Sequence, residues 1–241
     1  MMNFRPVYYM ITGWPTLDKT KEMVRRYVEH GVTALQFDMP AADPSREAKF
    51  IQDGMRHVRQ LYGEEYDIFM DTLREIRREF PQLEIHLVVY ADVVDAVGVE
   101  RFGDFCVEIG TYSVLAGDKE KMAYLNTRGI ATAAFIGYDT SDEAIEIAKR
   151  NDQQIVFVSN ANGRTKPREG LVTWSERIGY IRRQGVRAPI FGVTGIKTPE
   201  ELRMVKEAGA DGAYIGSIMM QLWDNEPELW KLLDAFQASA E

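Results

Sequence analysis

The segment that decides the fold is FGVTGIKTPEELRMVKEAGADGAYIGSIM, residues 191–219. It begins with a short apolar run, continues with a helix-periodic stretch that opens on Thr198 and Pro199, and ends with a second apolar run after Gly209. Threonine, proline and the two following glutamates are signals of a helix start, and a glycine commonly follows a helix end. The segment therefore predicts a strand, a helix and a second strand.

The same alternation runs along the whole chain. Strands are predicted where apolar and β-branched residues cluster, at 7–12, 34–39, 84–90, 113–116, 131–136, 154–159, 189–192 and 212–215. Helices are predicted at 17–29, 45–62, 66–79, 99–109, 119–127, 141–149, 173–183, 199–207 and 218–236. This order implies a parallel sheet with right-handed crossovers. Eight such units favour an α/β fold closed as a (β/α)8 TIM barrel over an open doubly wound sheet, and 241 residues fit one barrel domain, 1–241.

The bulk composition excludes several classes of partner. A net charge of -8 and a pI near 5.1 argue against nucleic acid and anionic membrane, which both require clustered lysine and arginine. The single cysteine, Cys106, excludes an intrachain disulfide and sits in a helical pattern as a small buried residue. No apolar run is long enough to span a bilayer, and residues 1–6 lack a signal peptide's apolar stretch. We expect a cytoplasmic protein.

Residues 31–52, GVTALQFDMPAADPSREAKFIQ, carry a family resemblance. They resemble the signature of the tryptophan synthase α subunit, E-L-G-x-P-F-S-D-P-x-x-D-G-P-x-I-Q. Alignment on Pro40, Asp43 and Gln52 places the family's catalytic glutamate at Gln36 and its second acidic residue at Glu47. An amide cannot exchange a proton as a carboxylate does. The resemblance therefore implies an α-subunit-like protein that diverges at the catalytic glutamate.

Further segments extend this resemblance over nearly the whole chain, at 8–24, 88–102, 137–148, 156–166 and 191–219. The last of these is similar to the phosphate-binding half of the family's barrel, G-F-G-I-S-x-P-E…GADGxIVGSA. The resemblance implies that a substrate phosphate is held at Thr194, Gly195, Gly216 and Ser217, with Tyr90 also on the substrate side. Glycine lets the backbone approach an anion closely, and we expect Gly216 and Ser217 to open a helix whose N–H groups face the phosphate.

A substitute for the missing glutamate lies two residues farther along the strand. Side chains alternate along a strand, so Gln36 and Asp38 are predicted to share one face, with Asp38 nearer the end where barrel chemistry occurs. We expect Asp38 to act as general acid and base, Glu47 to move a second proton, and Gln36 to orient the substrate. The alternatives are that Asp38 only caps a loop or pairs with an arginine, and that Glu47 only stabilises a helix start.

The remaining carboxylates permit a metal without requiring one. Asp38, Asp92 and Asp118 could hold Mg²⁺ through oxygen ligands, although helix capping is the favoured interpretation of Asp118 and of Asp139. The histidines are not predicted as ligands, and His86 in particular is expected away from the site face. We therefore predict no metal and no cofactor. The chain offers no lysine at a strand end for a Schiff base, so PLP would belong only to a partner subunit.

Three functions remain open at this stage. The first is a lyase that cleaves or rearranges a small phosphorylated substrate by carboxylate acid–base chemistry. The second, implied by the resemblance, is the conventional lyase of tryptophan biosynthesis, which converts indole-3-glycerol phosphate into indole and glyceraldehyde 3-phosphate. The third is a non-catalytic module that binds a phosphorylated ligand or docks a tryptophan synthase β-like subunit. The expected protein partner is such a subunit or a second copy in a homo-oligomer.

Overall fold

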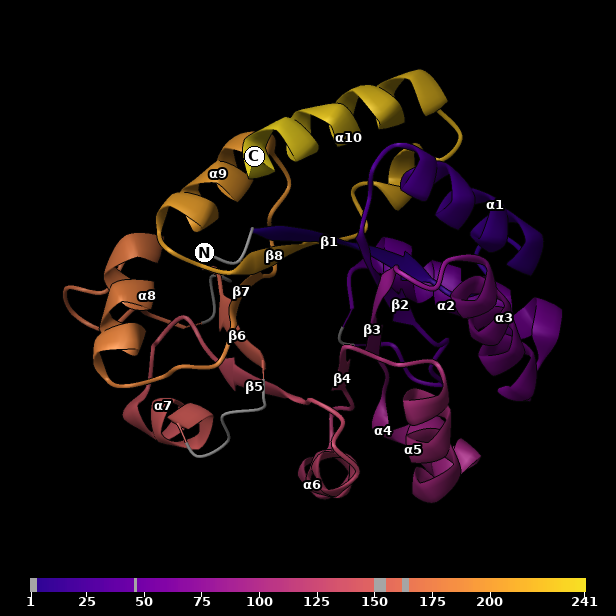
Figure 1. Cartoon of the computed structure of the whole chain (residues 1–241), viewed down its shortest axis with the longest axis horizontal. Coiled ribbons are helices and arrows are strands. Elements are labelled where there is room, and N and C mark those ends of the chain that lie inside the picture. Colours follow the sequence, from indigo (N-terminus) through magenta and orange to yellow (C-terminus); the bar gives the residue numbers. More distant parts are fainter. Residues whose placement is uncertain (1–3, 46, 150–154, 162–164) are drawn as a thin grey trace. The chain divides into compact units, whose positions relative to one another are not determined.

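The computed structural model describes residues 4–45, 47–149, 155–161 and 165–241, and within them eight strands form one sheet in the order β4-β3-β2-β1-β8-β7-β6-β5. The strands are parallel, and at least one helix separates each strand from the next in the sequence (Figure 1). This is the order of a (β/α)8 TIM barrel, so the predicted fold class is confirmed.

The chain forms two compact units, residues 9–132 and residues 1–8 together with 133–241. The first contains the end of β1 (Arg5–Ile11), followed by β2 (Ala34–Asp38), β3 (Glu84–Val88) and β4 (Ser113–Leu115). Its helices are α1 (Leu17–Glu29), α2 (Lys49–Tyr62), α3 (Asp67–Glu79), α4 (Ala91–Val97), α5 (Val99–Glu108) and α6 (Lys119–Thr127). Its core is aromatic and aliphatic, with Phe37, Phe69 and Phe102 fully buried.

The second unit contains β5 (Ala133–Ile136), β6 (Ile155–Ser159), β7 (Ile190–Val193) and β8 (Gly212–Ile215). Its helices are α7 (Asp142–Lys149), α8 (Trp174–Arg183), α9 (Pro199–Glu207), the short 3-10 helix η1 (Met220–Leu222) and α10 (Glu226–Ala240). The first half of β1 completes it, because Arg5 to Tyr8 pair in register with Gly212 to Ile215. Gly212 is needed there because an added Cβ would lie 2.4 Å from the Phe191 ring and 2.5 Å from the Arg5 carbonyl oxygen.

The helix starts follow the signals in the sequence. Thr198 accepts a hydrogen bond from the Glu201 amide while the Glu201 side chain bonds back to the Thr198 amide, and Pro199 occupies the first turn. Asp118 caps α6 by accepting from the Lys121 amide at 2.9 Å, which confirms the capping interpretation.

Cys106 is 1% exposed, and burial raises its pKa to about 12, as expected for a small buried residue.

Two elements differ from the prediction. Helix α4 occupies residues 91–97, where the sequence predicts a loop between the strand at 84–90 and the helix at 99–109. The single helix expected over 218–236 is instead η1 followed by α10, which begins at Glu226 with Pro227 in its first turn. None of the helices in the described residues is both long enough and apolar enough to cross a membrane.

Candidate active site

Strand β2 arranges its polar side chains in two levels. Gln36 is in register with His86 on β3, and His86 is in register with Ser113 on β4. Asp38 lies one level nearer the carboxyl end of β2, in register with Val88. Residues two apart on a strand share a face, so Gln36 and Asp38 project to the same side. Both are buried, with Gln36 8% and Asp38 1% exposed.

Asp38 is held by a tyrosine from the neighbouring strand. The Tyr9 hydroxyl donates to Asp38 Oδ2 at 2.8 Å, while the buried Oδ1 has no hydrogen-bond partner among the described residues. Burial raises the pKa of Asp38 well above its ordinary value of 3.8; the Tyr9 bond opposes this shift and the charges of Glu47 and Asp92 add to it. Burial likewise raises the pKa of Tyr9, which stays protonated as the donor. Asp38 therefore keeps its proton to a higher pH than an ordinary aspartate does.

Glu47 and Tyr90 are also brought together. Glu47 is half-buried in the turn before α2, where its amide donates to the Pro44 carbonyl at 3.0 Å and its carbonyl accepts from Gln52 Nε2 at 2.8 Å. The Tyr90 hydroxyl donates to Glu47 Oε1 at 2.5 Å from the position just before α4. The first unit therefore carries two carboxyl groups, each bonded by a tyrosine hydroxyl but differing in burial.

The other aspartates have structural partners. Asp92 Oδ2 accepts from the Ala42 amide at 2.7 Å, which ties α4 to the loop after β2. Asp118 caps α6 and lies 3.8 Å from the Lys121 ammonium. Among the residues that the structure describes, no three His, Cys, Asp or Glu side chains gather as a metal-binding group.

His86 lies on the face from which it was expected to be absent. Its register with Gln36 places both side chains on one side of the sheet, so the prediction was wrong. Its Nδ1 is 2.8 Å from Ser113 Oγ, its Nε2 is 2.8 Å from Glu84 Oε1, and the ring is fully buried. These contacts connect His86, Ser113 and Glu84 in a polar network on the amino-terminal side of Asp38 along the strands.

In the second unit, the predicted phosphate-binding residues follow two neighbouring strands. Thr194 and Gly195 form the turn after β7 with φ of 61° and 77°, a left-handed conformation that is unusual for threonine. Asn160 Nδ2 lies 3.6 Å from where a Cβ on Gly195 would stand. Gly216 and Ser217 follow β8, and an added Cβ on Gly216 would meet nothing within 4 Å. Only η1 comes next, so the α-helix start expected at this point is not formed. The phosphate role stays a prediction.

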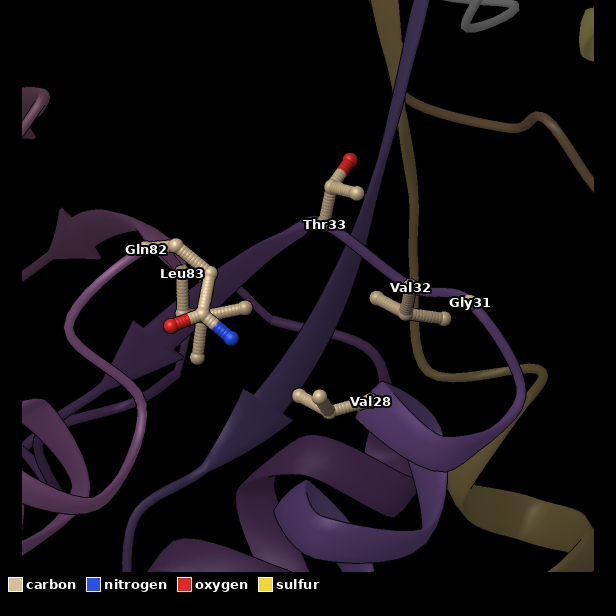
Figure 2. A pocket seen from close by; sticks show the side chains of 6 residues that line it. All are labelled: Val28, Gly31, Val32, Thr33, Gln82 and Leu83. Carbon is tan, nitrogen blue, oxygen red and sulfur yellow. The ribbon is translucent and has the colours of Figure 1, made fainter.

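A separate cavity lies at the opposite ends of two strands. It has a volume of about 190 Å³ and is lined by Val28, Gly31, Val32, Thr33, Gln82 and Leu83. Figure 2 shows these side chains around the segments that lead into β2 and β3. The lining is aliphatic with one hydroxyl and one amide, and catalysis in this fold occurs at the other ends of the strands. We assign no chemistry to this cavity.

Comparison with known proteins identifies the family of this chain. The sequence pattern of the tryptophan synthase alpha chain family matches residues 3–239. The tryptophan synthase alpha chain of Corynebacterium diphtheriae is 27% identical over 225 residues, covering 90% of this chain and 80% of that protein. That of Edwardsiella ictaluri is 27% identical over 241 residues, covering 95% and 89%.

Solved structures show the same fold. The tryptophan synthase subunit alpha of Legionella pneumophila superposes with a TM-score of 0.80 at 19% identity, covering 98% of this chain and 92% of that one. The sequence match over nearly the whole length carries the assignment, and the chain belongs to the tryptophan synthase alpha chain family.

Proposed function

We propose that this chain is a lyase that breaks a carbon–carbon bond in a small phosphorylated substrate, with Asp38 as its acid and Glu47 as its base. The observation that carries the proposal is the buried Asp38 carboxyl, bonded by Tyr9 and with a raised pKa. Perturbed carboxyls in a buried strand-end site are the groups that acid–base catalysis uses. The family assignment supports a lyase, since the family's own reaction is an aldol-type cleavage.

The chemistry requires two proton transfers. A base removes the proton of a substrate hydroxyl, its oxygen forms a carbonyl, and the adjacent carbon–carbon bond breaks. The electron pair of that bond passes to the departing carbon, which takes a proton from an acid. The protonated Asp38 can supply this second proton, and Glu47, which is half-buried and bonded by Tyr90, can accept the first. Exchange with solvent then returns both carboxyls to their starting states.

Gln36 has a different role in this proposal. Its amide donates and accepts hydrogen bonds but transfers no proton, so it orients the substrate beside the acid. Thr194, Gly195, Gly216 and Ser217 hold the substrate phosphate through backbone amides, as the family resemblance implies. Phosphate affinity at these turns is testable apart from the chemistry.

The first experiment is to incubate the purified protein with indole-3-glycerol phosphate and to measure both binding and indole release. Release at an enzymatic rate would assign the conventional family reaction. Asp38→Asn should then lower turnover by roughly 10²–10⁴-fold, the range of general acid–base catalysis. Asp43→Asn is the matched control, because Asp43 is exposed and its Oδ1 accepts from the nearby Ser45 amide. Undiminished turnover in the Asp38 variant would refute its assignment.

A second candidate is favoured by one observation, the amide of Gln36 at the position of the family's catalytic glutamate. A chain that kept the fold but not the reaction could bind a phosphorylated ligand or dock a tryptophan synthase β-like subunit, which would carry any PLP. Binding of indole-3-glycerol phosphate without indole release would support this candidate. Co-elution with a β subunit in size-exclusion chromatography would identify the partner, and elution at twice the monomer mass would indicate a homo-oligomer.

A further inference from the structure

Among the residues that the structure describes, Arg177 is the largest fully buried side chain, at 1% exposure. It projects from α8 toward the carboxyl ends of β5 and β6. Its guanidinium donates to Thr140 Oγ1 at 2.9 Å, to the Gly137 carbonyl at 2.8 Å and to the Ser159 carbonyl at 2.5 Å. One side chain thus fixes the turn after β5 and the last residue of β6.

The positive charge of Arg177 has no bonded countercharge. Its hydrogen-bond acceptors are neutral, and no carboxylate lies within ion-pair distance of it in the part of the chain that the structure describes. Its guanidinium carbon lies 4.9 Å from the Tyr138 ring and 5.7 Å from the Trp174 ring. Burial lowers its pKa to about 10, and the charges of Tyr138 and Asp139 oppose this shift. Arg177 therefore remains a cation at neutral pH.

This cation lies beside one of the predicted phosphate turns. Ser159, which accepts from Arg177, is followed by Asn160, and the Asn160 amide donates to the Val193 carbonyl at 3.1 Å. Asn160 Nδ2 lies 3.6 Å from where a Cβ on Gly195 would stand. The guanidinium therefore bonds the residue before Asn160, and Asn160 bonds the last residue of β7, directly before the turn at Thr194 and Gly195. A buried charge without a countercharge is stabilised when an anion enters nearby, because the low-dielectric surroundings screen it weakly.

We propose that Arg177 is a positioning residue that supplies fixed positive charge to an anion bound at the Thr194–Gly195 turn, an inference that rests on the proposed phosphate-binding function. It bonds the end of β6 beside that turn and does not touch the ligand. At an effective dielectric constant near 20, two unit charges about 10 Å apart attract by the equivalent of roughly a tenfold change in affinity. The neutral backbone amides of the turns supply the remaining contacts.

The test measures the Kd of inorganic phosphate by isothermal titration calorimetry for the wild type and three variants. Arg177→Gln removes the charge and should weaken binding at least tenfold. Arg177→Lys keeps the charge and should bind within threefold of the wild type. Arg182→Gln is the matched control on the same helix, because Arg182 also donates to two carbonyls, those of Val186 and Ala188, but pairs with Asp211. It should leave the Kd within twofold.

The possible results separate the two proposals. A wild type that does not bind phosphate overturns the phosphate-binding function itself. A wild type that binds, with Arg177→Gln equally tight, overturns only the role of Arg177. Equal weakening in Arg177→Gln and Arg177→Lys also overturns the charge role, since the bonding geometry would then be what matters. If Arg177→Gln lacks a cooperative thermal transition, Arg177→Met replaces it, because its unbranched side chain retains packing beside Tyr138 and Trp174.

Discussion

Replacing Asp38 with asparagine should change how the stability of the protein depends on pH. The Asp38 carboxyl is buried and its pKa is raised, mainly by desolvation. Between the ordinary pKa of 3.8 and the raised one, the folded chain keeps a proton that the unfolded chain loses. The stabilisation from the protonated form is therefore complete below the ordinary pKa and is lost as the pH rises toward the raised one.

The magnitude of this effect follows from the number of protons that Asp38 binds, which differs by at most one between the folded and the unfolded chain. Differential binding of one proton changes the free energy of unfolding by up to about 1.4 kcal/mol per pH unit. The wild type should lose stability at up to this slope as the pH rises from about 4, relative to a variant whose residue 38 does not titrate. Above the raised pKa both states are ionised and the difference becomes constant. An asparagine keeps the shape of the side chain and can still accept from Tyr9.

The assay is urea denaturation at half-unit intervals from pH 4.5 to 9, with the free energy of unfolding compared between the wild type and Asp38→Asn. Asp118→Asn is the control, because a backbone hydrogen bond from Lys121 lowers the Asp118 pKa and keeps the group ionised over this range. Its difference from the wild type should be flat. If the free energy of unfolding depended on pH in the same way for the wild type and Asp38→Asn, the Asp38 pKa would not be raised. That result would also refute the role of Asp38 as the acid.

Three further predictions follow from local geometry. Tyr9→Phe removes a bond that favours the ionised Asp38 carboxyl, so the alkaline limb of the kcat/KM profile should move to higher pH; an unmoved limb would argue against Asp38 as the acid. Cys106, buried and with a pKa near 12, should resist a thiol reagent at pH 8 until urea unfolds the chain, and fast labelling of the native protein would contradict its burial. Thr198→Ala removes the capping box with Glu201 and should cost about 1 kcal/mol in urea denaturation, whereas an unchanged midpoint would show that the cap contributes nothing.

Much of the fold was predictable because its determinants are local. Each of the eight strands was predicted within a few residues of its observed bounds, and α1, α6 and α9 match their predicted ranges in full. The two elements that differ from the prediction, α4 and the divided C-terminal helix, also have signals in the sequence. Val93, Val94 and Val97 have the helical spacing of a buried face, which marks α4 despite their β-branched side chains. Pro227 directly after Asn225 and Glu226 is the usual start of a new helix, and it divides the C-terminal segment.

The site was less predictable because its partners meet across strands. That Tyr9 rather than an arginine bonds Asp38 depends on the placement of β1 beside β2, which neither strand encodes by itself. Arg177 had a detectable signal. It occupies the helical spacing of Trp174, Ile178 and Ile181, the buried face of α8, so a charge was placed where the pattern requires an apolar residue. A charged residue at such a position is a candidate for a specific role.

The two departures from the family signature in β2, at Gln36 and Asp38, together move the carboxylate two residues along the strand. By the resemblance described above, Gln36 stands where the signature has its catalytic glutamate, and Asp38 stands where it has glycine. Each residue of a strand advances about 3.3 Å, so the acid lies roughly 6–7 Å nearer the carboxyl end of β2. Proton transfer requires heavy atoms within about 3 Å, so the reacting carbon must lie at the higher level as well. A substrate that reacts at the depth of Gln36 would meet an amide there and the Asp38 side chain in its path. Indole release should therefore respond more to Gln36→Glu combined with Asp38→Gly than to either replacement alone. If Gln36→Glu alone released indole as fast as the double variant, Asp38 would not determine the level at which the substrate reacts.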